Sequence, residues 1–370
     1  MVSTRVTTPA TDAAWDFVQQ VLADLADVVR TDARDARERV EGYRVLARIL
    51  ALCSELTVDV DPEVPRLFPM STPLRQVGGP NPDGEYDLCA ISPGEAYRIA
   101  GRRGSVAYLG FQVMAGTGLT PRRQAAYVGD TGLELDDGGG FSFVIAPTDP
   151  GTGERWLPVP EDASAIVVRQ YIADRSTETP ATYAVTRLAP PGPVAPLDDA
   201  TMAEQLTALG WTAVKLMTLH RTVLPELLER PNRLVTAEPA SLGSENTTPD
   251  NLYMIGGFDL GDDEALQIDI VPPASRYWSV TLENIWHECL EPFRRRSSLT
   301  SAHVEPGPDG VVRVVVAGSD PGADLGTDTG IGHWLDTGGR RRGFVTLRWL
   351  DHPSPPEVTT TVLPLREVTA

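Results

Sequence analysis

The run Asn284–Glu288 is the densest group of side chains that could perform chemistry, and it follows a strand-like aromatic stretch. If the strand continues through the run, alternation places Asn284, Trp286 and Glu288 on one face and His287 on the other. A carboxylate beside an indole in a protein interior has a raised pKa and can act as a general acid or base. This interpretation makes Glu288 and His287 catalytic residues, and Trp286 and Asn284 substrate contacts. The competing interpretation, the more frequent one for such clusters, places Trp286 in the core and the two ionisable side chains on a solvated strand end.

A second cluster is the run His333–Asp336. His333 and Asp336 could form a hydrogen-bonded pair in which the carboxylate fixes the imidazole tautomer, which makes both of them candidate catalytic residues. Trp334 would then be a wall of the substrate site. The alternative is a structural turn, in which Asp336 caps the bend at 337–339 and Trp334 closes the edge of a sheet.

Two arginines, Arg169 and Arg348, precede aromatic residues in similar strand-like stretches. A duplicated arginine is more often a buried ion-pair partner or an anchor for backbone carbonyls than a substrate clamp. We favour the structural role, and we keep Arg348, together with Tyr277 of the aromatic strand, among the candidate substrate contacts.

Motifs of high specificity are missing from the sequence: it has no P-loop, no G-x-S-x-G elbow, no H-E-x-x-H and no nucleotide-binding G-x-G-x-x-G after a strand. A transition-metal site joining His287, Glu288 and His333 fits the residue types, but the spacing does not require it. The acidic stretches 259–264 and 320–328 lack the alternating ligands of a calcium loop and are expected to be solvated turns. We therefore predict neither a metal nor a cofactor.

Composition excludes several classes of partner. The 370 residues carry a formal net charge of -19, and Lys215 is the only lysine. Nucleic acids and anionic membranes are bound mainly through clustered basic residues, so we expect neither partner. Three cysteines without metal-like spacing, and an N-terminus without a signal-peptide core, favour a cytoplasmic protein.

Two segments have the apolar spacing of helices. The first runs from Asp12 to about Leu56 and contains a charged middle, 30–41, that is expected to be an exposed turn or a solvated face. The second begins after Asp198-Asp199, which can act as an N-cap, and places one apolar stripe over 202–224 before Pro225 ends it.

Internal similarity is the most informative feature of the remaining, strand-rich sequence. Each half contains an acidic turn, a strand, an aromatic strand, an Asp-Gly turn, a strand ending in Asp-Pro-Gly, a Trp-Leu pair and a strand with arginine. Equivalent residues of the two halves are separated by 170 to 179 residues. The separation is 170 for Ser105 and Ser275, 178 for Trp156 and Trp334, and 179 for Arg169 and Arg348. This slow drift is what loop insertions would produce, so the chain is a tandem duplication.

The pattern predicts an α+β, mainly β fold, made of two tandem antiparallel β-sandwich or jelly-roll-like modules with helical annexes. The expected boundaries are 1–60 for a helical segment, 61–195 for the first module, 196–235 for a connecting helical segment and 236–370 for the second module. Each helical segment is expected to cover an open face or edge of the sheet that follows it.

The second copy resembles the bacterial family known as domain of unknown function 1214. The resemblance rests on Tyr277–Val280 leading into Asn284–Trp286, on two turns, Asp309-Gly310 and Asp320–Gly322, and on His333–Thr337 with Arg348-Trp349. The first copy looks like a companion version, through Tyr97–Gly101, Trp156–Pro158 and Arg169–Tyr171, so the resemblance spans roughly residues 80–352. Family members commonly carry asparagine before the Trp-Leu pair, where this chain has His333 after an insertion, 323–331. The resemblance implies paired β-sandwich domains and no assigned chemistry.

Taken together, the clusters favour a protein that acts on a small molecule through a site in the second module. Without a cofactor or covalent nucleophile, a lyase, isomerase or hydrolase acting on a small apolar or sugar-like substrate is favoured over redox chemistry. The alternative is a non-catalytic binding or scaffolding protein that uses the duplicated modules. A small-molecule ligand is the expected partner, and the composition leaves room for a homo-oligomer.

Overall fold

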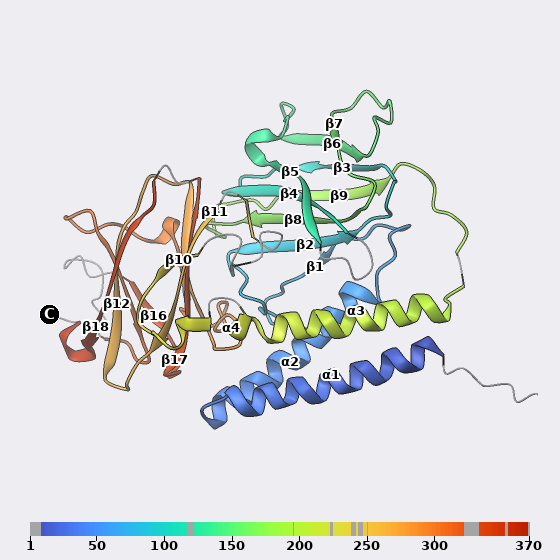
Figure 1. Cartoon of the computed structure of the whole chain (residues 1–370). Coiled ribbons are helices and arrows are strands. Elements are labelled where there is room, and N and C mark those ends of the chain that lie inside the picture. Colours follow the sequence, from blue (N-terminus) through green and yellow to red (C-terminus); the bar gives the residue numbers. More distant parts are fainter. Residues whose placement is uncertain are drawn as a thin grey trace, which may run out of the picture.

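A computed structural model describes residues 9–116, 122–194, 196–222, 225–237, 242, 247–249, 251–321, 333–351 and 354–368. Within them the chain forms two β modules that lie side by side and a layer of helices that runs beneath the first module towards the second (Figure 1). None of the described helices is both long and apolar enough to cross a lipid bilayer.

The first helical segment forms two helices, α1 (Ala10–Asp32) and α2 (Ala36–Thr57). They are separated by a short break at 33–35, where the carboxylate of Asp35 accepts a hydrogen bond from the Glu38 amide and caps α2. The second segment forms α3 (Asp199–Met217) and the short α4 (Leu219–Thr222), and Asp198 is the N-cap of α3, as predicted.

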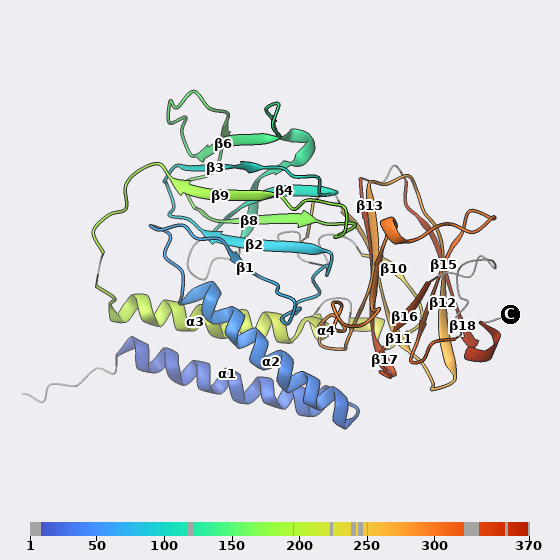
Figure 2. The ribbon, with the colours of Figure 1, turned by 180° about the vertical axis from the view of Figure 1, so that it is seen from behind.

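The helices pack on one another instead of each covering its own sheet. The apolar stripes of α1, α2 and α3 form one core, which includes Leu25, Val29, Ile49 and Ala213. Seen from behind, the three helices form a common layer under the first module (Figure 2). The expectation of one helical cover for each module is thus met only at the ends of the two segments, where Leu56 packs on the sheet of the first module and Leu227 on that of the second.

The first module is a sandwich of two sheets. The five-stranded sheet has the order β1 (Phe68–Pro69), β2 (Gly84–Ala90), β8 (Ala163–Tyr171), β4 (Tyr108–Ala115) and β5 (Arg123–Gly129). The four-stranded sheet has the order β7 (Trp156–Pro158), β6 (Gly140–Ala146), β3 (Tyr97–Arg102) and β9 (Thr182–Arg187). Side chains of the two inner faces, such as Ile99, Phe111 and Val168, form the core between the sheets.

The second module repeats this arrangement. Its five-stranded sheet has the order β10 (Val235–Ala237), β11 (Asn251–Asp259), β17 (Arg342–Leu350), β13 (Tyr277–Glu283) and β14 (Ser298–Thr300). Its four-stranded sheet has the order β16 (His333–Asp336), β15 (Val312–Ala317), β12 (Glu264–Val271) and β18 (Glu357–Pro364). Short 3-10 turns lie at Asp130–Gly132, Pro225–Leu227, Ser301–His303 and Leu365–Glu367.

The order of strands confirms the duplication, because each strand of the first module has a counterpart in the same place of the second. Trp156 and Trp334 lie on matching edge strands, and their indole N–H groups donate to the carbonyls of Ala146 and Ala317, at 3.0 and 3.2 Å. These two edge strands are the parallel exceptions in otherwise antiparallel sheets. The shared tryptophan therefore closes a sheet edge in both copies.

The two modules meet through a layer of buried tyrosines. The ring of Tyr171 lies 4.9 Å from that of Tyr108 and 5.1 Å from that of Tyr277, measured between centroids. Tyr277 is fully buried, and its hydroxyl accepts a hydrogen bond of 2.6 Å from the Asn81 amide. This layer joins the modules into one body and places Tyr277, a predicted substrate contact, in the junction.

Candidate functional site

The run Asn284–Glu288 forms a turn and does not continue strand β13, which ends at Glu283. The side-chain oxygen of Asn284 accepts hydrogen bonds from the backbone amides of Trp286 and Glu288, at 2.9 and 3.1 Å. His287 adopts a left-handed backbone conformation, with φ of 55°. The expected alternation over this run was wrong, because the asparagine holds the chain in a turn that competes with the strand.

Trp286 anchors this turn in the helical layer. Only 1% of its surface is exposed, and its indole N–H donates to the backbone carbonyl of Glu38, at 2.8 Å. Gly42 of α2 lies directly against the ring, since a Cβ atom at this glycine would be 2.9 Å from the indole. The indole is thus part of the core between α2 and the second module, as in the competing interpretation.

Glu288 points to the same helix. Its carboxylate is 1% exposed and contacts the guanidinium groups of Arg44, at 2.6 Å, and Arg48. These arginines are one helical turn apart on α2, so both can reach the same carboxylate. Both oxygens of Glu288 are therefore occupied by arginine, which makes it a positioning group for the two guanidiniums.

His287 turns the other way and pairs with Glu283. Its Nδ1 lies 2.8 Å from a carboxylate oxygen of Glu283, whose other oxygen accepts from the Thr346 hydroxyl at 3.0 Å. The imidazole stacks on Phe344 with a centroid distance of 4.2 Å, and its Nε2 is buried without a hydrogen-bond partner. Burial raises the pKa of Glu283, but the bond to His287 and the charge of Arg348 outweigh it, so the pKa lies below its usual range.

The sequence did not point to Glu283, because this residue lies just before the run Asn284–Glu288 that contains His287. The only signal was the spacing of four residues between the two side chains, which brings them together only when a tight turn lies between. The resulting pair has the geometry of a carboxylate that orients an imidazole.

The second predicted cluster does not form an internal pair. Asp336 contacts Arg295 and accepts a hydrogen bond of 2.6 Å from the Gly338 amide, so it caps the bend as the alternative interpretation expected. His333 lies 3.1 Å from Arg296, and both burial and this arginine lower the pKa of the imidazole. Both residues belong to strand β16, where a spacing of three places their side chains on opposite faces.

Arg348 has the structural surroundings that its duplication suggested. It is buried, donates to the carbonyl of Gly79 at 2.8 Å and lies over the ring of Tyr253. Its guanidinium is 3.9 Å from the carboxylate of Glu283. It therefore connects the segment between β1 and β2 of the first module to the five-stranded sheet of the second.

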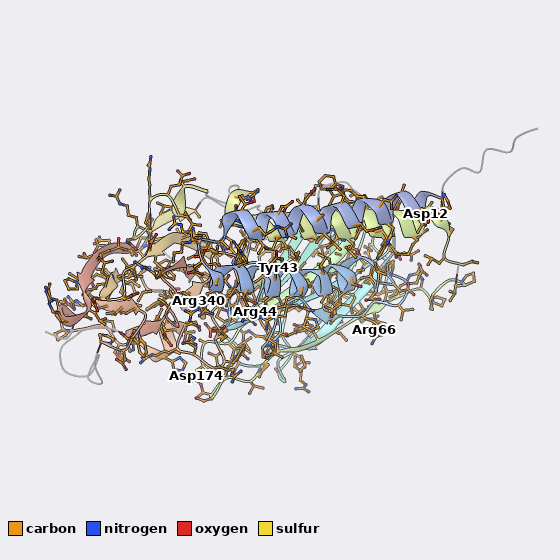
Figure 3. The ribbon with its side chains drawn as sticks, turned by 90° about the horizontal axis from the view of Figure 1, so that it is seen from below. Asp12, Tyr43, Arg44, Arg66, Asp174 and Arg340 are labelled. Carbon is orange, nitrogen blue, oxygen red and sulfur yellow. The ribbon has the colours of Figure 1, made fainter. Side chains whose placement is uncertain are left out.

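A pocket of about 500 Å³ opens where α2 meets the second module. Six arginines line it, namely Arg37, Arg44, Arg48, Arg294, Arg295 and Arg340. Arg44 and Arg340 come from sequence positions almost 300 residues apart and lie close together here (Figure 3). Four apolar residues, Pro73, Leu74, Pro292 and Phe293, also belong to the lining.

Carboxylates hold these arginines in place. Glu291 is the one acidic residue among the described residues of the lining, and it contacts Arg295 at 3.3 Å and Arg340 at 3.1 Å. Behind the lining, Glu41 pairs with Arg340, Glu288 with Arg44 and Arg48, and Asp336 with Arg295. Six arginines thus face four carboxylates, which leaves a positive pocket in a chain with a net charge of -19.

One carboxylate from each of the two predicted clusters therefore contacts the same arginine pocket, although the clusters do not form a common catalytic site. Glu288 and Asp336 both support arginines of this pocket, whereas His287, Trp286 and Trp334 do not line it. The charged middle of the first helical segment is mostly exposed, as expected, but Glu38 and Glu41 depart from this and are buried against Arg342 and Arg340. These partners lie some 300 residues away in sequence, so no local pattern could reveal them.

A metal centre is not apparent in the part of the chain that the structure describes, where no three histidine, cysteine, aspartate or glutamate side chains are placed to hold an ion. The acidic stretch 259–264 forms the end of β11 and a turn, in which the Gly261 amide donates to Glu264 at 2.7 Å. Most of the stretch 320–328 and all of the insertion 323–331 lie outside the described residues.

Comparison with known proteins supports the resemblance seen in the sequence. The model of the family "Protein of unknown function (DUF1214)" matches residues 265–354. The crystal structure of an uncharacterised protein from Burkholderia cenocepacia is 30% identical, with a TM-score of 0.87 over 96% of this chain and 97% of that one. The VPA0106 protein from Vibrio parahaemolyticus is 11% identical, with a TM-score of 0.49 over 86% of this chain and 97% of that one. None of the curated proteins matches the chain. With a relative of this identity over nearly its whole length, the chain belongs to the DUF1214 family.

Proposed function

We propose that this protein binds a small anionic organic molecule in the arginine-lined pocket between α2 and the second module. The observation that carries the proposal is the lining itself, which presents six arginines and one carboxylate. Arginine offers a planar fork of N–H donors that matches a carboxylate or phosphate group, and several forks around one cavity favour a ligand with such a group.

The volume of the pocket and its apolar lining residues limit the class of ligand further. About 500 Å³ is within the range of pockets that hold metabolite-sized molecules. Leu74 and Phe293 are exposed apolar residues of the same lining. A ligand that combines an acidic group with an apolar or sugar-like body would contact both the arginines and the apolar residues of the lining, which refines the apolar or sugar-like substrate expected from the sequence.

The arginines of the pocket are held in fixed orientations, which is typical of a binding site. Arg340 is 9% exposed at its side chain and is held by Glu41 and Glu291. Gly338, with φ of 63°, allows Arg295 and Arg340 to approach its backbone, since a Cβ there would be within 2.9 Å of both guanidiniums. Donors that are already oriented lose less side-chain entropy when a ligand binds.

Acid–base catalysis by His287 is the second candidate function, and it would make the protein a cofactor-independent lyase, isomerase or hydrolase. The observation that favours it is the pair with Glu283, which leaves the buried Nε2 of the imidazole without a partner. A substrate hydroxyl or water next to this atom could transfer a proton to it. Since His287 does not line the arginine pocket, this chemistry would need a second point of access.

The binding proposal is tested by calorimetric titration with mono-, di- and tricarboxylates and with organic phosphates at low and high salt. We expect binding that weakens with salt and that falls at least tenfold in Arg44→Gln, with Arg123→Gln as the matched control. Arg123 is also paired with a carboxylate, Asp162, but lies on the first module away from the pocket. Absence of binding for the whole set, or equal affinity in both variants, would refute the proposal. Chemical change of a bound ligand, followed by NMR in wild type and His287→Gln, separates catalysis from binding.

A further inference from the structure

One wall of the arginine pocket contains a hydrogen-bond acceptor that has no partner. Gln76, in the segment between α2 and β2, lines the pocket and is only 4% exposed. Its side-chain Nε2 donates to the backbone carbonyl of Thr72, at 2.7 Å, which fixes the orientation of the amide. The other end of the amide, Oε1, is buried and has no hydrogen-bond partner.

The position of Gln76 is fixed by the same turn that carries Glu288. The backbone carbonyl of Gln76 accepts a hydrogen bond of 3.0 Å from the amide of Cys289, and Val77 pairs with Glu288 in an antiparallel bridge. The backbone that carries this acceptor is therefore held by hydrogen bonds to the turn of the second module. A buried polar atom without a partner costs about 1–3 kcal/mol, so such atoms in a binding site commonly meet a ligand group.

The neighbouring donors limit what this ligand group can be. Arg44 also lines the pocket, and its Nε is buried without a partner. A carboxylate oxygen can satisfy Arg44 but cannot donate to the oxygen of Gln76. An ammonium group could donate, but six arginines in the lining oppose a second positive charge. A hydroxyl group is neutral, donates one hydrogen bond and accepts others.

We infer that the ligand of this pocket is a hydroxylated anion, such as a hydroxy acid, a sugar acid or a sugar phosphate, whose hydroxyl donates to Oε1 of Gln76. The inference rests on the proposed anion site and adds the residue that selects among anions. The arginines hold the acidic group, and Gln76 distinguishes a hydroxylated chain from a deoxy chain of equal charge. Sites built to hydrogen-bond a hydroxyl discriminate strongly against analogues that lack it, since the polar atom is then left unpaired.

The test uses pairs of anions that match in charge and length and differ in hydroxyl groups. Malate is compared with succinate, glucarate with adipate, and glycerol 3-phosphate with propyl phosphate, each by calorimetric titration of the full-length protein. We expect the hydroxylated member of at least one pair to bind 10- to 100-fold more tightly. Gln76→Leu should abolish this preference and leave the affinity for the deoxy member unchanged, while Gln76→Met provides a second variant of similar volume.

The outcomes separate the two proposals. Equal affinity of both members of every pair, or a preference that survives in Gln76→Leu and Gln76→Met, overturns the role of Gln76 and leaves the anion site standing. Absence of binding for all six anions overturns both. Since the backbone contact to Cys289 does not depend on the side chain, circular dichroism of each variant confirms that the fold is retained.

Discussion

Replacing Trp286 by alanine tests whether this residue is a core anchor or a wall of a ligand site. The indole is 1% exposed and packs on Gly42 and Val29 of the helical layer, and its N–H is bonded to the Glu38 carbonyl. Because the surroundings of a truncated core residue relax only partly, the change leaves a cavity. Truncation of a buried tryptophan typically costs about 3–5 kcal/mol in the free energy of unfolding.

The assay is urea unfolding followed by far-ultraviolet circular dichroism, in which the helical layer contributes strongly. We expect Trp286→Ala to lower the free energy of unfolding by about 3–5 kcal/mol, which moves the loss of helical signal to a lower urea concentration. The control is Trp15→Ala, on α1, because this tryptophan is 53% exposed and its loss should change stability by less than about 0.5 kcal/mol. A loss below about 1 kcal/mol in Trp286→Ala, especially with lost anion binding, would refute the core assignment and restore the ligand-wall interpretation.

Three further outcomes follow from other contacts. Gly42→Ala should destabilise by up to about 2 kcal/mol in the same urea assay, although alanine normally stabilises a helix by about 1 kcal/mol, because its Cβ would press on the indole; a stabilised variant would contradict the packing. Glu288→Gln should weaken anion binding several-fold in calorimetric titrations, because Arg44 and Arg48 lose the carboxylate that orients them, whereas unchanged affinity would mean that Glu288 does not position them. Burial raises the pKa of Asp83 from 3.8 to about 6, although Arg175 and Arg348 oppose the shift. The folded state therefore holds this proton more tightly, so stability should fall as the pH rises from about 4 to about 6. Asp83→Asn should remove this slope in urea unfolding at several pH values and stabilise the protein at neutral pH by about 1–3 kcal/mol, and an unchanged slope would exclude Asp83 as its source.

Much of the fold was predictable because it depends on the local spacing of apolar residues and on the internal repeat of the sequence. The apolar stripe from Val21 to Cys53 follows helical spacing, and the structure buries it. The landmarks Trp156 and Trp334 lie at equivalent edges of the two modules, because the same strand order was copied with the sequence. Alternation and turn residues act over a few positions, so they can be recognised without knowledge of the tertiary structure.

Within the candidate site, the sequence identified the right region and assigned the wrong roles to several side chains. It singled out Glu288 because a carboxylate beside tryptophan suggests acid–base chemistry, and Asp336 because it could orient the imidazole of His333. The structure instead pairs them with Arg48 and Arg295, which makes both of them supports of a positive pocket. For Glu288 the cause was the turn at Asn284, whose side chain accepts from the amides of Trp286 and Glu288 and ends the alternation of the strand.

The sequence by itself determined the duplicated sandwiches, the helices and their caps, since each depends on neighbours within a few residues. Only the tertiary structure decided that Arg44 meets Glu288, 244 residues away, and that Glu41 meets Arg340. It also decided that Gln76, a residue of the pocket lining, has one end of its amide hydrogen-bonded and the other buried without a partner. Such ion pairs and unpaired buried atoms depend on which distant segments the fold brings together. A contact between distant segments produces no periodic pattern in the sequence, so the sequence alone could not reveal it.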